Sequence, residues 1–297
     1  MQFRRATFTD KKRIIEICSN IWEGDDYIPN ILDQWIADDK GEFTVLVEDG
    51  QIMGMGKLTF AEPGVGWLEG LRVAPEARGR GYAREITRYF IRKGREMGFD
   101  RLQLSTYYQN DASIHIIESY GFKRIADFYY AEQKVNPTKN LFRDEVMQAT
   151  LNGVDYEELV QLFLNAPEQK VVNGFIGLGW FFKKLKKEEL NNAIKRGHIY
   201  YLKKDGQIVG GIFIYPDHKK DNSYYIPMVT GTDEAITALL QWVYEDAVRR
   251  GFKTLAAMIP NDSRLKSIYL DQGFKHWEEG IDANVFVYEL KLRGGDE

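Results

Sequence analysis

Short sequence patterns recur along this chain in the same order, about half a chain apart. A repeat of this kind constrains the fold more than composition does, because each copy is expected to build the same unit. The matching pairs are Ala6-Thr7 with Ala149-Thr150, Asp49-Gly50-Gln51-Ile52 with Asp205-Gly206-Gln207-Ile208, Gly98-Phe99 with Gly251-Phe252, Asn110-Asp111 with Asn261-Asp262, and Gly121-Phe122 with Gly273-Phe274. The 297 residues also exceed a usual single domain of about 150 residues. The sequence therefore predicts two copies of one domain, over residues 1–138 and 144–297, joined near Asn136-Pro137-Thr138.

The composition is that of a globular protein and excludes several classes. A net charge of −4 argues against a broad nucleic-acid surface, which needs a basic excess. No signal core and no apolar run of about 18 residues is found, so we expect a cytoplasmic protein that is not inserted in a membrane. The single cysteine, Cys18, excludes an internal disulfide and cysteine-based metal sites. The four histidines show no ligand spacing, so no metal site is expected. A monomer and a homodimer are both compatible with the sequence.

Local patterns in the first copy alternate between strands and helices. Asp49-Gly50 between two apolar runs is typical of a two-residue hairpin turn. Strands are predicted at Phe3–Ala6, Phe43–Val47, Ile52–Phe60, Trp67–Val73, around Leu102 and Leu104, and at Phe122–Tyr130; helices are predicted at Asp10–Ser19, Tyr82–Met97 and Ser113–Tyr120. This order predicts an α/β fold, in which each domain has a mixed, mostly antiparallel sheet flanked by helices.

The most informative segment is Val73-Ala74-Pro75-Glu76-Ala77-Arg78-Gly79-Arg80-Gly81-Tyr82-Ala83, where a strand ends and a helix begins. Glycines allow backbone N–H groups to approach a ligand closely, and a helix N-terminus carries partial positive charge. With Arg78 and Arg80 added, the segment can cradle a phosphate. The alternative is a surface turn with solvated arginines. The spacing of a dinucleotide-binding loop and that of a P-loop are both absent.

The pattern Arg78-x-x-Gly81-x-Ala83 resembles the coenzyme A loop of the GCN5-related N-acetyltransferase (GNAT) superfamily. Asn110 followed by Gly121-Phe122, and the opening Arg4-Arg5-Ala6-Thr7, are similar to other signatures of that family. The resemblance implies tandem GNAT-like domains and acetyl-CoA as the acetyl donor. It also implies the residues that bind the donor: Leu71, Arg72 and Val73 along the pantetheine arm, Arg78, Gly79, Arg80, Gly81, Tyr82, Ala83 and Arg84 around the pyrophosphate, and Asn110, whose alternative role is to cap a helix.

The implied reaction is direct attack of an amine on the thioester, which needs a base. Glu69 lies two and four residues before Leu71 and Val73, so alternation predicts that the three share one face. A carboxylate on an apolar face is costly unless it is used. We therefore expect Glu69 to be catalytic or to bind substrate, with a structural role as the alternative.

The general acid is not evident. Ile117 and Ser105 occupy positions where many family members carry a tyrosine and a base. Tyr120, Tyr107, Tyr108 or water could protonate the leaving thiolate. Of these, Tyr120 is the predicted general acid.

The segment between the first helix and the second strand shapes the acceptor pocket in this superfamily. Asp25 and Asp26 would suit an acceptor that bears an amine, and Tyr27 and Trp35 could form its walls. The alternative is that the aspartates cap the following helix. This segment and Leu68–Pro75 are similar to the vertebrate histidine N-acetyltransferases, which suggests a free amino acid as the acceptor.

The second copy lacks the basic loop. Its corresponding segment reads Gly231-Thr232-Asp233-Glu234, with two acids and no arginine. Carboxylates at a helix N-terminus fill and repel an anion site. The second copy is therefore predicted to be a degenerate domain that serves as a scaffold or as a wall of the acceptor site.

Taken together, these features favour an N-acetyltransferase that acts on a small amine or amino acid. The alternatives are an enzyme that acetylates a peptide or protein amine, and a weakly catalytic sensor that binds coenzyme A.

Overall fold

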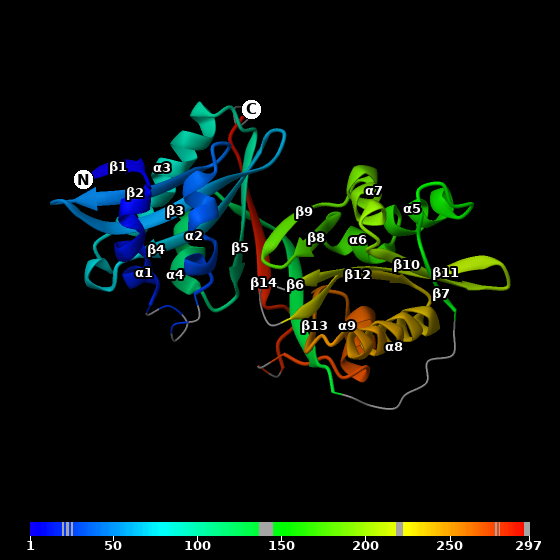
Figure 1. Ribbon diagram of the computed structural model, residues 1–297. Helices are drawn as coiled ribbons and strands as arrows, with labels where there is room; N and C mark the ends of the chain where they lie inside the picture. Colours follow the sequence, from blue (N-terminus) through cyan, green and yellow to red (C-terminus); the bar gives the residue numbers. More distant parts are fainter. Residues whose placement is uncertain are drawn as a thin grey trace. The chain divides into compact units, whose positions relative to one another are not determined.

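The sequence repeat corresponds to two compact units, each with its own set of strands and helices (Figure 1). The computed structural model describes residues 1–19, 21, 24, 26–136, 145–217, 222–276, 278 and 280–293. Unit 1 comprises Met1–Thr106, Asn110–Arg124 and Val287–Glu297, and unit 2 comprises Tyr107–Gln109 and Ile125–Phe286. Most of the predicted joint, from residue 137 onwards, lies outside the described residues.

The sheet of unit 1 confirms the predicted mixed, mostly antiparallel arrangement. Its strands, in spatial order, are β1 (Gln2–Arg5), β2 (Glu42–Glu48), β3 (Gln51–Glu62), β4 (Val65–Val73), β5 (Arg101–Tyr107) and β14 (Val285–Lys291). The pairs β1–β2, β2–β3 and β3–β4 are antiparallel, whereas β4–β5 is parallel. The predicted hairpin turn is confirmed, because Asp49 and Gly50 adopt φ values of 50° and 76°, as a type I′ turn requires.

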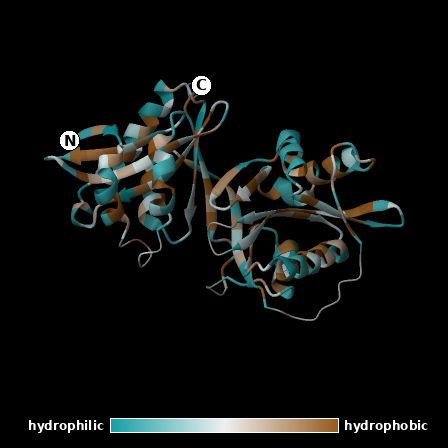
Figure 2. Ribbon diagram, viewed as in Figure 1, coloured by the Kyte–Doolittle hydropathy of each residue, from teal (hydrophilic) through white to brown (hydrophobic). Residues whose placement is uncertain are grey.

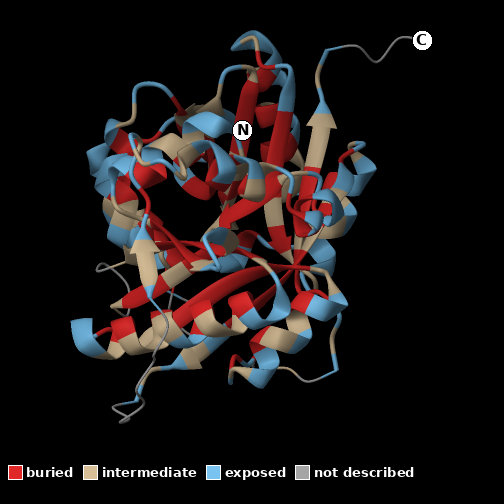
Figure 3. Ribbon diagram, turned by 90° about the vertical axis from the view of Figure 1, so that its right-hand side faces the viewer, coloured by how far each residue is buried: buried red, intermediate tan, exposed pale blue. Residues whose placement is uncertain are grey.

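Helices cover both faces of this sheet. They are α1 (Lys11–Cys18), α2 (Ile28–Ala37), α3 (Tyr82–Glu96) and α4 (Asp111–Ser119), with short 3₁₀ turns at Phe8–Asp10 and Pro75–Ala77. α3 lies so close to β3 that a Cβ on Gly56 would be 2.6 Å from the ring of Phe90. α2 covers the opposite face, where Trp35 packs against Phe43 with ring centroids 5.3 Å apart. Buried residues accordingly follow the strands and the inner faces of the helices (Figure 3).

Unit 2 repeats the same plan. Its strands, in spatial order, are β7 (Val146–Gln148), β10 (Ile199–Lys204), β11 (Gln207–Asp217), β12 (Ser223–Gly231), β13 (Thr254–Pro260) and β6 (Lys123–Lys134); its helices are α5 (Tyr156–Leu164), α6 (Pro167–Val171), α7 (Lys187–Lys195), α8 (Asp233–Arg250) and α9 (Ser263–Asp271), and β8 (Phe175–Leu178) and β9 (Phe181–Lys184) form a separate hairpin. Two hydrophobic clusters, one with α8 and one with α5, form its core. Figure 2 shows apolar residues along the strands and mixed polarity along the helices. Among the described residues no helix is long and apolar enough to span a membrane.

Each unit takes its last strand from the other half of the sequence. β6 pairs with β13 from Phe128↔Pro260 to Lys134↔Thr254, inside unit 2. β14 lies beside β5 in unit 1, where the Gln103 side chain donates to Glu289 at 2.8 Å. The prediction that residues 122–130 form a strand is confirmed, and residues 125 onwards of this strand fall in the compact unit formed mainly by the second half of the sequence. The units thus cut across the ranges 1–138 and 144–297 at these two strands, because a strand's own pattern does not encode its partner.

Candidate functional site

A β-bulge interrupts β4 at Gly70 and Leu71. The register places Arg72 opposite Met55 and Glu69 opposite Lys57. Two residues of β4 therefore occupy the space of one residue on β3. Gly70 adopts a φ of 64°, and a Cβ there would lie 2.5 Å from the ring of Trp35. Both the conformation and the close ring favour glycine at this position.

The bulge changes which residues share a face of β4. Glu69 and Arg72 lie on one face, together with Lys57 and α2. Val73 lies opposite Gly54, whose missing side chain would meet α3. The prediction that Glu69 shares a face with Leu71 and Val73 is therefore wrong, because the inserted residue shifts the alternation by one.

The strands β4 and β5 pair only over their first halves. Their register runs from Val65↔Arg101 to Trp67↔Gln103, and no later pair is formed among the described residues. The bulge and Leu71 to Val73 follow this point, and the side chain of Leu71 is exposed. The part of β4 predicted to bind the pantetheine arm is thus the part without a ladder to β5.

The loop after β4 presents unpaired backbone donors. Gly79 and Gly81 adopt φ values of 76° and 86°, with open space where a Cβ would be. The first backbone bond of α3 is donated by the N–H of Glu85 to Gly81, at 3.2 Å. Within the described part of the chain, no backbone partner is found for the N–H groups of Gly79, Arg80, Gly81, Tyr82, Ala83 and Arg84. Such orphan donors at a helix N-terminus suit a phosphate group.

The arginines of this loop differ in their surroundings. Arg78 is exposed, and its guanidinium has no ion-pair partner among the described residues. Arg80 pairs with Glu48 at 3.1 Å and lies over the Tyr82 ring, 5.1 Å from its centroid. The hydroxyl of Tyr82 donates to Glu48, which raises the pKa of Tyr82. Arg78 is therefore a cation that is available to an anionic ligand.

Asn110 and Tyr120 stand at opposite ends of α4. Asn110 is exposed, and its side chain forms no capping bond, so the capping alternative does not describe it. The hydroxyl of Tyr120 donates to the backbone carbonyl of Arg84 at 3.0 Å, and the Arg84 guanidinium donates to Ser119 at 3.1 Å. Tyr120 thus ties α4 to α3.

The other tyrosines considered as acids belong to unit 2. Tyr107 and Tyr108 fall in that unit, and the hydroxyl of Tyr107 donates to Glu278 at 2.5 Å. Ile117 is buried in unit 1, as expected for an apolar side chain.

Glu69 is a partly buried carboxyl group held by β3. The hydroxyl of Thr59 donates to Glu69 Oε1 at 2.5 Å. Burial raises the pKa of Glu69, whereas the bond from Thr59 and the charge of Lys57 oppose the rise. A carboxyl group whose pKa is raised towards neutrality is suited to act as a general base.

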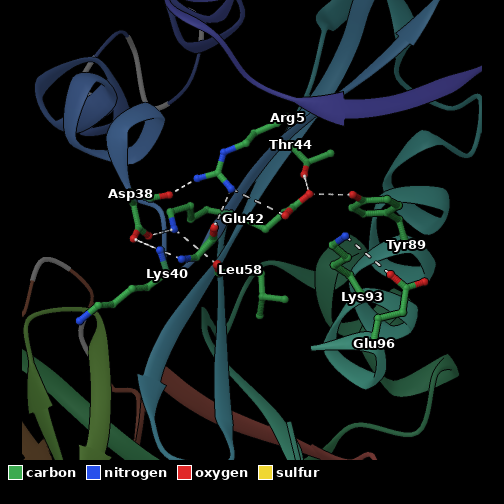
Figure 4. Close-up of polar contacts among 11 residues, drawn as sticks. Arg5, Asp38, Lys40, Glu42, Thr44, Leu58, Tyr89, Lys93 and Glu96 are labelled. Atoms are coloured by element: carbon green, nitrogen blue, oxygen red, sulfur yellow. Dashed lines mark hydrogen bonds and ion pairs between the residues drawn. The ribbon is translucent and has the colours of Figure 1, made fainter. Parts of the chain in front are cut away.

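Two ion pairs fix the ends of α2 to the face that carries Glu69. Before the helix, Asp26 accepts from Arg72 Nε at 2.8 Å and from Arg72 Nη2 at 3.2 Å, and it also accepts from the N–H of Ile28 at 3.1 Å. After the helix, Asp38 pairs with Lys57. Figure 4 shows Asp38 beside Arg5, which donates to its backbone carbonyl. Both oxygens of Asp26 are thus engaged within the protein, which favours the capping alternative, and Asp25 lies outside the described residues.

Tyr27 and Trp35 lie on the same face, and their role as walls of an acceptor pocket stays a prediction. Their rings meet edge to face with centroids 6.0 Å apart, and the Arg72 guanidinium lies 5.9 Å from the Tyr27 centroid. Burial, and then the charge of Glu69, raise the pKa of Tyr27. Cys18 is buried, as predicted, and burial near Asp26 raises the pKa of its thiol to about 12.

Sequence reasoning missed Lys57, Thr59 and Asp38. Lys57 interrupts the apolar side of the strand Ile52–Phe60, in line with Met53 and Met55. A lysine at an inward position of an otherwise apolar strand was the available signal.

Unit 2 has a β-bulge that corresponds to the one in β4, but it lacks the loop with glycines and arginines that follows β4. Its register places Met228 opposite Phe213 and Tyr225 opposite Tyr215, so Tyr225 occupies the place of Glu69. A single residue, Thr232, connects β12 to α8, where residues 74–81 connect β4 to α3. The Thr232 side chain accepts from the N–H of Ala235 at 3.2 Å. Arg264 donates to Asp233 at 2.6 Å and to the carbonyl of Gly231 at 2.9 Å. The start of α8 is thus filled by the protein's own groups.

Three kinds of comparison agree with this geometry. Residues 11–122 match the acetyltransferase (GNAT) family. Histidine N-acetyltransferase of Xenopus tropicalis is 37% identical over 92 residues, which are 31% of this chain and 28% of that protein. This chain therefore matches well under two thirds of that relative's length.

Solved structures share the fold over the whole chain. A GCN5-related N-acetyltransferase from Sphaerobacter thermophilus superimposes with a TM-score of 0.68 at 15% identity, covering 100% of this chain and 97% of that one. A tandem GNAT protein from the clavulanic acid biosynthesis pathway gives a TM-score of 0.62 at 11% identity, covering 99% of each chain. The whole chain thus shares the fold of these two structures, and residues 11–122 match the acetyltransferase (GNAT) family.

Proposed function

We propose that this protein transfers the acetyl group of acetyl-CoA to the amine of a small acceptor, an amino acid or a small amine. The observation that carries the proposal is that β4 presents both parts of the chemistry. Glu69 lies next to its bulge, and the loop with orphan N–H donors follows its last residue. The loop fits a pyrophosphate, because a side chain at Gly79 or Gly81 would occupy the open space beside those donors. Bound acetyl-CoA would supply the acetyl group as an activated thioester.

In the proposed reaction Glu69 accepts the proton that the acceptor must lose to expose its nitrogen lone pair. The nitrogen then bonds to the thioester carbonyl carbon as the carbon–sulfur bond breaks, and the thiolate gains a proton. A thiol with a pKa near ~8.5 needs little help from an acid. Water, or Tyr120 after releasing Arg84, supplies that proton.

We propose that one coenzyme A binds per chain. The shortened loop of unit 2, its capped helix and the acids Asp233 and Glu234 support this assignment. Residues 144–297 then act as a degenerate domain, in which the contacts of Arg264 replace those of a ligand. Calorimetry with wild type and with an R78A/R80A variant tests the stoichiometry. Two equivalents of coenzyme A bound by wild type, or an unchanged Kd in the variant, would refute it.

The acceptor class is tested by release of the free thiol. The relative that is named a histidine N-acetyltransferase supports a free amino acid, so the panel contains histidine and other amino acids, polyamines and short peptides. We expect turnover with a free amino acid or small amine. Turnover with peptides alone would support the peptide alternative, and tight donor binding without turnover would support the sensor.

The base is tested by Glu69→Gln. We expect a loss of about 10²–10⁴-fold in kcat, the usual contribution of a general base, with unchanged affinity for acetyl-CoA. Glu96→Gln, on the exposed end of α3, is the matched control and should behave as wild type. Full turnover by Glu69→Gln would exclude Glu69 as the base.

A further inference from the structure

Lys57 is a charged residue in the interior of unit 1. Its side chain is 1% exposed, and an ammonium group is costly to bury unless it is paired. Its Nζ is paired with Asp38 and donates to the carbonyl of Leu58 at 3.4 Å. The function proposed above leaves this buried cation without a role.

Lys57 lies directly opposite Glu69 in the β3–β4 register. Opposite residues of antiparallel strands have Cβ atoms about 4.5–5.5 Å apart and project from the same face. Thr59 is the next residue on that face of β3, and it donates to Glu69 at 2.5 Å. One stretch of β3 therefore supplies both a hydrogen bond and a positive charge to the carboxylate.

The other charged groups on this face have ion-pair or hydrogen-bond partners of their own. The charged groups that act on Glu69 are Lys57 on β3 and Asp38 after α2, and Tyr27 before α2 interacts with it as well. Arg72, Asp26 and Cys18 interact with Tyr27 on the same face. Arg72 is bound by both oxygens of Asp26. Asp38 also accepts from the N–H groups of Lys40 and Gly41, at 3.1 and 3.2 Å. Lys57 is therefore not the sole partner of the Asp38 carboxylate among the described residues, and its positive charge can also act on Glu69.

We propose that Lys57, anchored by Asp38, is the positioning residue of Glu69 and holds its carboxylate in the ionised form that accepts the acceptor's proton. The proposal rests on the function proposed above, because Lys57 acts only through Glu69. Burial favours the protonated form of Glu69, and the ammonium of Lys57 opposes it. The pair thereby sets the pH at which the base becomes available.

The test is the pH dependence of kcat/KM for Lys57→Met and Lys57→Arg. An opposite charge at this range lowers the pKa of a carboxyl group by about one unit or more. Removing the charge in Lys57→Met raises the pKa of Glu69. The acidic limb of the profile, where kcat/KM rises with pH as Glu69 ionises, should therefore move to higher pH by about one unit. Below the limb kcat/KM then falls about tenfold, and above it the two profiles meet. Lys57→Arg keeps the charge and should keep the limb in place.

Lys40→Met is the matched control, because Lys40 is an exposed lysine two residues after Asp38. It removes the same charge and should leave the limb unmoved. If Lys57→Met fails to fold, a Lys57→Met/Asp38→Asn variant removes both partners and avoids an unpaired carboxylate. The charge of Asp38 raises the pKa of Glu69, so this variant should shift the profile in the same direction but by less than Lys57→Met alone.

A second readout does not need turnover. Carbon-13 NMR follows the Glu69 carboxyl through a pH titration without acetyl donor, and Glu69→Gln identifies its signal. If wild type acetylates no acceptor, the proposed function fails while this titration still tests Lys57. An equal titration midpoint in wild type and Lys57→Met, or a uniform loss of rate at all pH values, would overturn the proposal.

Discussion

Tyr288→Ala should destabilise unit 1, although Tyr288 belongs to the second half of the sequence. Its side chain is 2% exposed on β14, and its hydroxyl donates to Glu118 of α4 at 2.8 Å. Truncation of a buried aromatic residue to alanine costs about 3–5 kcal/mol. Typical domains are stable by only about 5–15 kcal/mol. The variant should therefore lose a large part of the stability of the unit that carries Glu69.

Hydrogen exchange measured by mass spectrometry shows which strands and helices lose stability in Tyr288→Ala. Protection in β5 and α4 should fall by about 10² to a few times 10³-fold, since 1.4 kcal/mol corresponds to a factor of ten. Peptides of β11 and β12 should stay protected. Phe128→Ala is the reciprocal variant, because Phe128 is fully buried on β6 and packs against Phe182 in unit 2, with ring centroids 4.7 Å apart. If each variant instead opened the unit built by its own half of the sequence, the exchange of strands would be refuted.

Three further changes probe single contacts. Arg78→Ala should weaken binding of acetyl-CoA about tenfold, as expected for one charged hydrogen bond, without altering Tm; an unchanged Kd by calorimetry would remove Arg78 from the site. The hydrogen bonds from Arg4 lower the pKa of Asp10 to about 2, so the ionised pair stabilises the fold above the unfolded value of ~3.9 and is lost as the pH falls from about 4 through 2. Asp10→Asn should cost about 2 kcal/mol in urea unfolding at pH 7 and little near pH 2, and an equal cost at both would contradict this assignment. Gly70→Ala should cost about 1–3 kcal/mol, because a methyl group would lie 2.5 Å from the Trp35 ring at a φ of 64°; an unchanged Tm would contradict it.

Local elements were predictable because their signals lie within a few residues. The hairpin at Asp49-Gly50, the start of α3 at Tyr82 and the end of α4 before Gly121 all follow from turn chemistry and periodicity. The repeat predicted two similar sheets, and the basic loop predicted a place for phosphate.

Features that depend on partners were not predictable. The bulge at Gly70 appears only when β4 is aligned with β3, and it reversed the inferred face of Glu69. The engagement of Asp26 by Arg72 joins residues far apart in sequence. The exchange of β6 and β14 depends on which sheet edge each strand reaches, and alternation along a strand is the same for either edge.

The exchanged strands bear on how such a chain can evolve. A recombination event that removed either half would leave the other with an uncovered sheet edge, and exposed edges promote aggregation. We therefore expect the half without the basic loop to be needed for folding of the other half. Its loops are free to diverge, while β14 must continue to match β5. We expect homologous chains to vary most in the loops of unit 2 and least along β14.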